Sequence, residues 1–139
     1  MLNLTALADV LKEKTAWQLT PSEVTDDQYL AMILRGLRRL FIDTGRAAEF
    51  DVMKLIMLDD NTYNYDGTFL IDEEEYILCC AEIDFFKKVQ SDVNNAFGYS
   101  TDALTVTNAD KPYANLKDTI DDIDNERRII YYKMVRYTI

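Results

Sequence analysis

The residues that could bind a metal ion lie between Thr62 and Glu73. Asn64, Asp66, Gly67 and Glu73 match the third, fifth, sixth and twelfth positions of a helix–loop–helix calcium loop. The first position is Thr62, which lacks the carboxylate that normally anchors the ion, and no strong helix precedes it. We therefore favour an acidic turn that leads into a helix.

A wider acidic run lies between Lys54 and Lys87, where no basic residue occurs. Hydrolases that use divalent metals need carboxylates that converge from several elements, whereas contiguous acids on one helical turn diverge. The chain also has no histidine. The run is more typical of a solvated helix start, or of an acidic surface that meets a basic neighbour. Its members are Asp59, Asp60, Asp66, Asp72, Glu73, Glu74, Glu75, Glu82 and Asp84.

The two cysteines, Cys79 and Cys80, are adjacent. Neighbouring residues in a helix point about 100° apart and do not bridge easily. The pair is typical of small core residues in a reducing cytoplasm. The four glycines do not cluster. We therefore expect no catalytic residue, no cofactor, no metal site and no enzyme.

Length and composition predict a single domain over residues 1–139, with enough apolar residues to bury a core. The formal charge of −10 argues against binding a nucleic-acid backbone, because phosphates would be repelled, although DNA could slide past such a surface. Asp9 and Glu13 lie where a signal peptide would need an apolar run, and no stretch reaches membrane-spanning length. We expect a soluble protein made inside a cell, with no membrane partner.

Two amphipathic helices are predicted in the first third of the chain. The first covers about residues 4–14 and places Leu4, Leu7, Ala8 and Leu11 on one face. The second begins at a capping box of Thr25 and Gln28, and Gly45 ends it. Its apolar face comprises Tyr29, Ile33, Leu37, Leu40 and Phe41.

The next segment, residues 46–71, is harder to interpret. Residues 51–58 fit a short helix or a strand equally well. Asp66 and Gly67 form a turn signal, which predicts a short β-hairpin pairing residues 63–65 with residues 68–70.

The clearest helix follows, capped by Asp72 and ended by Gly98. Its apolar residues lie on more than one side, so it is central to the core or packed on another subunit. One stripe comprises Cys79, Ile83, Phe86, Val89, Val93 and Phe97, and Tyr76, Ile77, Leu78 and Phe85 lie off it.

A long last helix is predicted to start near Pro112. Arg127 interrupts its apolar repeat of Leu116, Ile120, Ile123, Ile130 and Met134. Acids dominate its early turns and bases its late turns, which complements the helix dipole. The predicted fold is mainly α, a small bundle of about four helices with a long C-terminal helix and a short β-hairpin.

Three groups of residues are candidates for portal or subunit interfaces. A basic patch and an acidic turn on different helices suit the head-to-tail contacts of a ring. Tyrosine and arginine anchor many interfaces, so residues 129–139 are predicted to dock. The candidates are Arg35, Arg38 and Arg39 in the patch, Glu73, Glu74 and Glu75 in the turn, and Arg128, Tyr131, Tyr132, Arg136 and Tyr137 near the C-terminus.

The order of these parts resembles the head-to-tail connector (adaptor) proteins of tailed bacteriophages. The resemblance depends on the order of the predicted helices, on residues 40–46 (LFIDTGR), and on a second stretch that runs to residues 125–128 (NERR). That second stretch includes Tyr99, Asp102, Thr105, Ala109, Asp110, Lys111, Pro112 and Tyr113.

The resemblance implies a helical subunit that assembles with copies of itself as a ring, typically dodecameric, beneath the portal protein. Such a ring lines part of the channel, lets double-stranded DNA pass without tight binding, and gives the neck or tail-completion protein its docking surface. The terminal segment that reaches the portal would be residues 133–139.

We therefore expect a structural virion protein of the neck, made in the bacterial cytoplasm. A neighbouring neck or head-completion role in the same assembly is the first alternative. An acidic cytoplasmic inhibitor, which mimics DNA or captures a host protein, also fits the charge of −10. A metal-dependent hydrolase has the least support.

Overall fold

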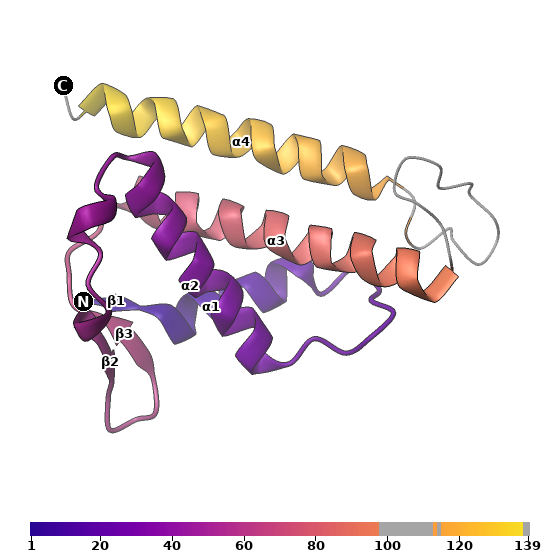
Figure 1. Cartoon of the computed structure of the whole chain (residues 1–139), viewed down its shortest axis with the longest axis horizontal. Helices are drawn as coiled ribbons and strands as arrows, with labels where there is room; N and C mark the ends of the chain where they lie inside the picture. The colour runs from indigo at the N-terminus through magenta and orange to yellow at the C-terminus, as the bar shows by residue number, and fades with distance from the viewer. Residues whose placement is uncertain (98–112, 114, 138–139) are drawn as a thin grey trace.

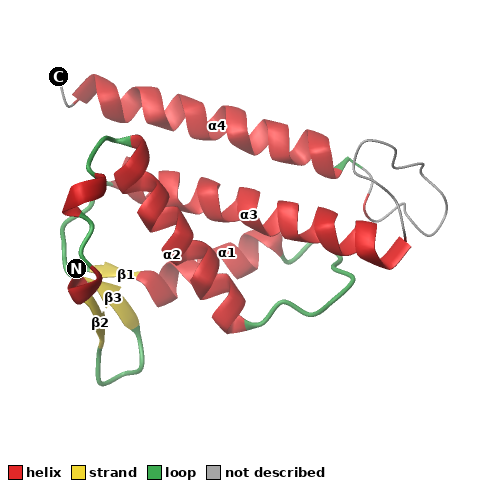
Figure 2. Ribbon diagram, in the orientation of Figure 1, coloured by secondary structure: helices red, strands yellow, loops and turns green. Residues whose placement is uncertain are grey.

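The longest helix, α3 (Ile71–Phe97), runs through the middle of the molecule in the computed structural model, which describes residues 1–97, 113 and 115–137 (Figure 1). Helix α2 (Asp26–Asp43) crosses it, and α4 (Leu116–Tyr137) runs back along it in the opposite direction. Helix α1 (Leu4–Thr15) packs against both α2 and α3. A small sheet lies at one end (Figure 2). The predicted fold class is confirmed.

Local caps explain where α1 and α2 begin. The side chain of Asn3 accepts a hydrogen bond from the backbone N–H of Ala6 at 3.0 Å. The predicted capping box of Thr25 and Gln28 is present, with both reciprocal hydrogen bonds formed. Gly45 follows the end of α2 with a φ of 72°. The predicted apolar faces of both helices are buried.

Helix α3 is buried on several sides, which shows that it is central to the core. Tyr76, Ile77 and Phe85 have no exposed surface. The predicted cap at Asp72 is wrong, because the helix begins at Ile71 and the N–H of Leu70 donates to the carboxylate of Glu73 at 2.9 Å. That bond is one half of a capping box, and it places the start of the helix two residues earlier than predicted. Gly98 and the side chain of Phe97 lie outside the described residues.

The sheet has the order β1-β3-β2, with antiparallel pairing throughout. Its central strand, β3 (Tyr63–Tyr65), pairs with β1 (Leu2–Asn3) and β2 (Leu55–Met57). Two short 3-10 helices, η1 (Ala47–Glu49) and η2 (Val52–Lys54), lie between α2 and β2.

A hairpin is therefore present, but its predicted partner strand is wrong. The turn lies at residues 58–62, where Asn61 has a φ of 64°, and not at Asp66 and Gly67. Residues 68–70 form no strand, because Phe69 turns inward and packs against the rings of Phe41 and Tyr65. Core packing of one aromatic side chain thus outweighs the local turn signal.

Helix α4 begins at Leu116, after Asn115 adopts a φ of 68°, so the predicted start near Pro112 is too early. Pro112 itself lies outside the described residues. Ile130 and Met134 are buried, so the predicted docking segment is partly core. Among the described residues, no helix combines the length and apolarity needed to cross a membrane.

Candidate functional site

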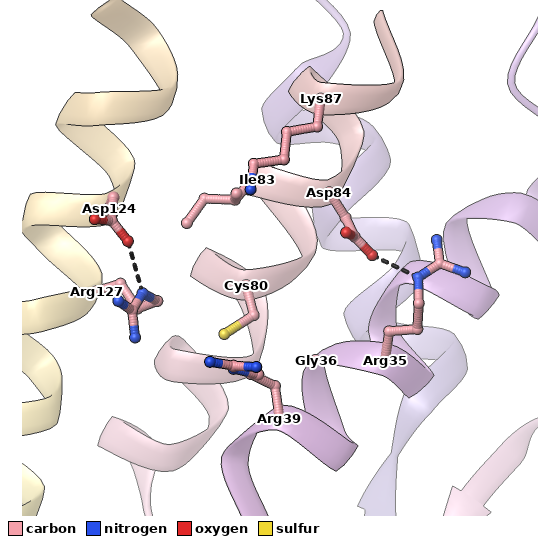
Figure 3. Close-up of a pocket in the computed structure, with 9 residues that line it drawn as sticks. All are labelled: Arg35, Gly36, Arg39, Cys80, Ile83, Asp84, Lys87, Asp124 and Arg127. Carbon is pink, nitrogen blue, oxygen red and sulfur yellow. Dashed lines mark hydrogen bonds and ion pairs between the residues drawn. The ribbon is translucent and has the colours of Figure 1, made fainter. Parts of the chain in front are cut away.

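A charged cleft of about 420 Å³ opens between α2, α3 and α4 (Figure 3). Four cations and two carboxylates line it, which leaves a formal excess of two positive charges in a chain whose formal charge is −10. The cleft is thus a positively charged site in an acidic protein. Its lining residues are Arg35, Gly36, Arg39, Cys80, Ile83, Asp84, Lys87, Asp124 and Arg127.

A close approach of α2 to α3 forms the floor of this charged cleft. A Cβ atom on Gly36 would lie 2.6 Å from the carbonyl oxygen of Ile77, so only glycine fits at this contact. Arg35 lies beside this glycine and Arg39 one turn later. The Nε of Arg35 reaches across to the carboxylate of Asp84 at 2.5 Å. Helix packing at one glycine therefore brings two predicted interface arginines to the cleft.

Arg127 enters the cleft from α4 and links all three helices. Its Nε donates to Asp124 at 2.9 Å, and its Nη1 donates to the hydroxyl of Tyr76 at 2.8 Å. The Tyr76 hydroxyl in turn donates to Asp43 on α2. Burial and this bond to Asp43 raise the pKa of Tyr76. Burial opposes the charge on Arg127, but the hydrogen bonds to Asp124 and Tyr76 prevail and raise its pKa.

In the sequence, Arg127 is visible only as an interruption of an apolar repeat. A cation at a core-facing position is itself a signal, because a buried charge requires a partner on another element. The identity of that partner depends on tertiary packing, since Tyr76 and Asp43 are distant in the sequence.

The Cys80 thiol lines the cleft but is a poor nucleophile. Burial raises the pKa of Cys80, and that of the buried Cys79, to about 12. Both thiols are free and remain protonated near neutral pH. The cleft therefore offers binding groups and no activated thiolate.

Most of the predicted patch residues have partners within the chain. Arg39 pairs with Asp43, and Arg38 lies over the ring of Phe50 at 5.7 Å. In the acidic turn, Glu73 pairs with Arg46 at 2.8 Å. Glu74 and Glu75 occupy the first turns of α3, and neither forms an ion pair within the described residues.

The C-terminal candidates meet the basic patch through a second, adjoining cleft of about 330 Å³. Arg39 and Arg127 line both clefts, and Arg128, Tyr131 and Tyr132 line the second. Arg128 also pairs with Asp124 at 3.1 Å. This second cleft therefore joins the basic patch of α2 to the C-terminal candidates of α4, which are distant in the sequence. The side chains of Arg136 and Tyr137 lie outside the described residues.

The residues considered for calcium serve other roles. Asn64 lies in strand β3, and its side-chain amide donates to the carbonyl and hydroxyl oxygens of Thr62, just before the strand. Glu73 is held by Arg46 and by the N–H of Leu70. Within the described ranges, no group of three or more metal-binding side chains is placed to hold an ion.

A second surface, missed by the sequence analysis, is apolar. The hairpin surface comprises the exposed side chains of Val52, Met53, Met57, Leu58 and Tyr63, and Met53 is 86% exposed. The sequence does contain a signal for this surface. Residues 52–58 (VMKLIML) are almost all apolar, and a short strand with one face on the core buries only every second residue, so some of these side chains must stay exposed.

No family model, curated protein or solved structure matches this chain. The resemblance to phage connector proteins therefore stays a prediction. The charged cleft and the hairpin surface are two places among the described residues whose chemistry suits a ligand or a partner.

Proposed function

We propose that this protein is a structural subunit of a phage neck, a head-to-tail connector that forms a ring of its own copies between the portal and the tail-completion protein. The hairpin surface is the observation that carries this proposal. Scattered exposed apolar residues are ordinary, but a contiguous group of them marks a surface that another protein covers. Here Val52, Met53 and Met57 are each at least half exposed and lie within one short segment.

The backbone beneath the hairpin surface favours the same role. Strand β2 lies at an edge of the sheet, so one side of it has no strand neighbour within the described residues. An edge strand can pair with a strand from another chain, and its side chains then add specificity. Methionine adapts its shape to a partner more readily than branched residues do.

The charged patches can supply orientation to such an assembly. Arg35 and Arg39 are each 60% exposed, and exposed ion pairs stabilise a protein by only about 0–1 kcal/mol. Arg35 and Arg39 can therefore leave their partners Asp84 and Asp43 and pair with acidic residues of a neighbouring subunit with little loss of stability. The overall negative charge would let DNA pass a ring without adhering to it.

The test is made on particles of the phage that encodes this chain. We expect the chain to be present in purified virions, and cryo-electron microscopy to place it as a ring against the portal. If the map instead places the chain in the next layer of the neck, the protein has the neighbouring head-completion role. Absence from purified particles would refute both.

Surface variants then test the interface. The double variant Met53→Asp, Met57→Asp should yield heads that fail to join tails, because it places charge in the apolar contact. Leu19→Asp is the control, because Leu19 is 61% exposed, between Met57 and Met53, and lies outside the hairpin surface; it should support normal assembly. Circular dichroism checks that both variants fold. Truncation after Arg128 is a poor test, because it removes the core residues Ile130 and Met134.

A further inference from the structure

We propose that the charged cleft between α2, α3 and α4 binds the phosphate group of a small phosphate monoester. All residues that line the cleft belong to one chain, so phosphate binding does not require ring assembly, although Arg35 and Arg39 would be shared with any neighbouring subunit. Its volume of about 420 Å³ lies within the range of pockets that hold small molecules, about 300–1,000 Å³.

Two arginines on α2 have donors to spare. The hydrogen bonds of Arg35 and Arg39 within the described residues go through Nε, to Asp84 at 2.5 Å and to Asp43 at 3.1 Å. A guanidinium has five N–H donors, so the Nη groups of both arginines remain available to oxygen atoms of a ligand. Paired N–H donors of this kind match the geometry of phosphate oxygens.

Two further cations complete the cleft from the other helices. Lys87 on α3 forms no ion pair within the described residues. Arg127 on α4 is held in place by Asp124 and Tyr76, so its position is set before any ligand arrives. Figure 3 shows Arg39 and Arg127 reaching into the space beside Cys80 from different helices. Donors fixed in advance lose less entropy on binding.

The other lining residues narrow the class of ligand. The four cations of the cleft face the two lining carboxylates and also Asp43, which pairs with Arg39 and lies 3.7 Å from Arg127, so one positive charge remains in formal excess. A phosphate monoester, which carries a charge of about −1.5 to −2 near neutral pH, complements this excess. Asp84 and Asp124 would repel more highly charged polyanions, and they can accept hydrogen bonds from hydroxyl groups. Ile83 and Cys80 give an apolar contact for the organic part of the ligand.

The test titrates the full-length, nitrogen-15-labelled protein and follows the Nε–Hε signals of its arginines by NMR. Separate samples receive inorganic phosphate, glucose 6-phosphate, adenosine monophosphate or citrate at constant ionic strength. We expect saturable shifts of the Arg39 and Arg127 signals with phosphate compounds and weaker binding of citrate. Glucose 6-phosphate or adenosine monophosphate should bind more tightly than inorganic phosphate, and the tighter of these two esters shows whether the organic part is a sugar or a nucleoside. Tightest binding of inorganic phosphate would contradict the contact with the organic part.

Variants locate the binding. Arg39→Gln and Lys87→Gln should each weaken binding by about tenfold or more, because each removes a charged hydrogen-bond donor. Both residues are exposed, so the fold should persist. Lys54→Gln removes an exposed cation on η2 and should leave affinity unchanged. Shifts that never saturate, equal weakening by Lys54→Gln, or citrate binding as tightly as phosphate would overturn the proposal.

Discussion

Helix α3 and the hairpin surface are both rich in apolar residues, yet the protein uses them in opposite ways. On α3, Tyr76, Ile77 and Phe85 are fully buried, because α1, α2 and α4 all pack against that helix. On the hairpin surface, Val52 and Met53 of η2 and Met57 of β2 are exposed. The same residue type therefore closes a core in one region and leaves a surface open to a partner in the other.

The two regions differ in how many of their faces are covered by other parts of the chain: α3 is covered on several sides, and the hairpin region on one. Tyr65 on β3 packs inward against the rings of Phe41 and Phe50. Val52 and Met53 of η2 and Leu58 of the turn are exposed, so they are not part of this inward packing. A short two-sided element beside a helical bundle can bury only one side, so its remaining apolar side chains stay exposed. Three predictions test this contrast.

The largest effect is expected where α2 meets α3. Gly36→Ala should lower the free energy of unfolding by about 3 kcal/mol, because the new Cβ would lie 2.6 Å from the backbone carbonyl oxygen of Ile77. Urea unfolding measures this loss. Gly45→Ala is the control: its φ of 72° costs about 1 kcal/mol, but no atom lies within 4 Å of the new group. Equal losses in the two variants would show that the helices do not meet as closely as described.

An intermediate and pH-dependent effect is expected at Glu82, a buried carboxyl on α3. Burial raises its pKa, although Nζ of Lys14 lies 3.1 Å from Oε1 and opposes the shift. That contact is an ion pair and not a well-aligned hydrogen bond. The folded protein therefore favours protonated Glu82. The resulting stabilisation is complete below the pKa of the unfolded chain and is lost as pH rises through the higher folded pKa.

Glu82→Gln removes this dependence, because its amide stays neutral. The difference in free energy of unfolding, variant minus natural protein, should therefore be more favourable to the variant at about pH 7 than at about pH 4. Urea unfolding at both pH values measures this difference. Lys14→Met, which removes the opposing cation, should enlarge the pH dependence of the natural carboxyl. A variant-to-parent difference that is identical at both pH values would contradict the assignment.

The smallest effect on stability is expected on the hairpin surface. Met53→Ser should change the free energy of unfolding by no more than about 0.5 kcal/mol, because the side chain is 86% exposed and loses little contact. Thermal unfolding provides the measurement. A loss near that of a core substitution would mean that this methionine packs within its own chain, and the hairpin surface would lose its role as an interface.

The predictions made from sequence succeeded where the signal was local. The capping box of Thr25 and Gln28 lies within four consecutive residues, and the apolar face of α2 repeats with the helical period. The prediction that residues 68–70 pair with β3 was wrong, because Phe69 turns inward to pack on Phe41, which is distant in the sequence. The cleft was not foreseen either, since Arg127 meets Tyr76 only after α4 packs on α3.

The sequence alone determined the number and type of the main helices, the burial of α3 and the acidic character of the chain, because helix period, caps and net charge are properties of neighbouring residues or of composition. The tertiary structure decided which strands pair, that four cations share one cleft, and that apolar residues remain exposed on the hairpin. Those outcomes depend on contacts between distant segments, and the energy of such contacts is set by packing in three dimensions.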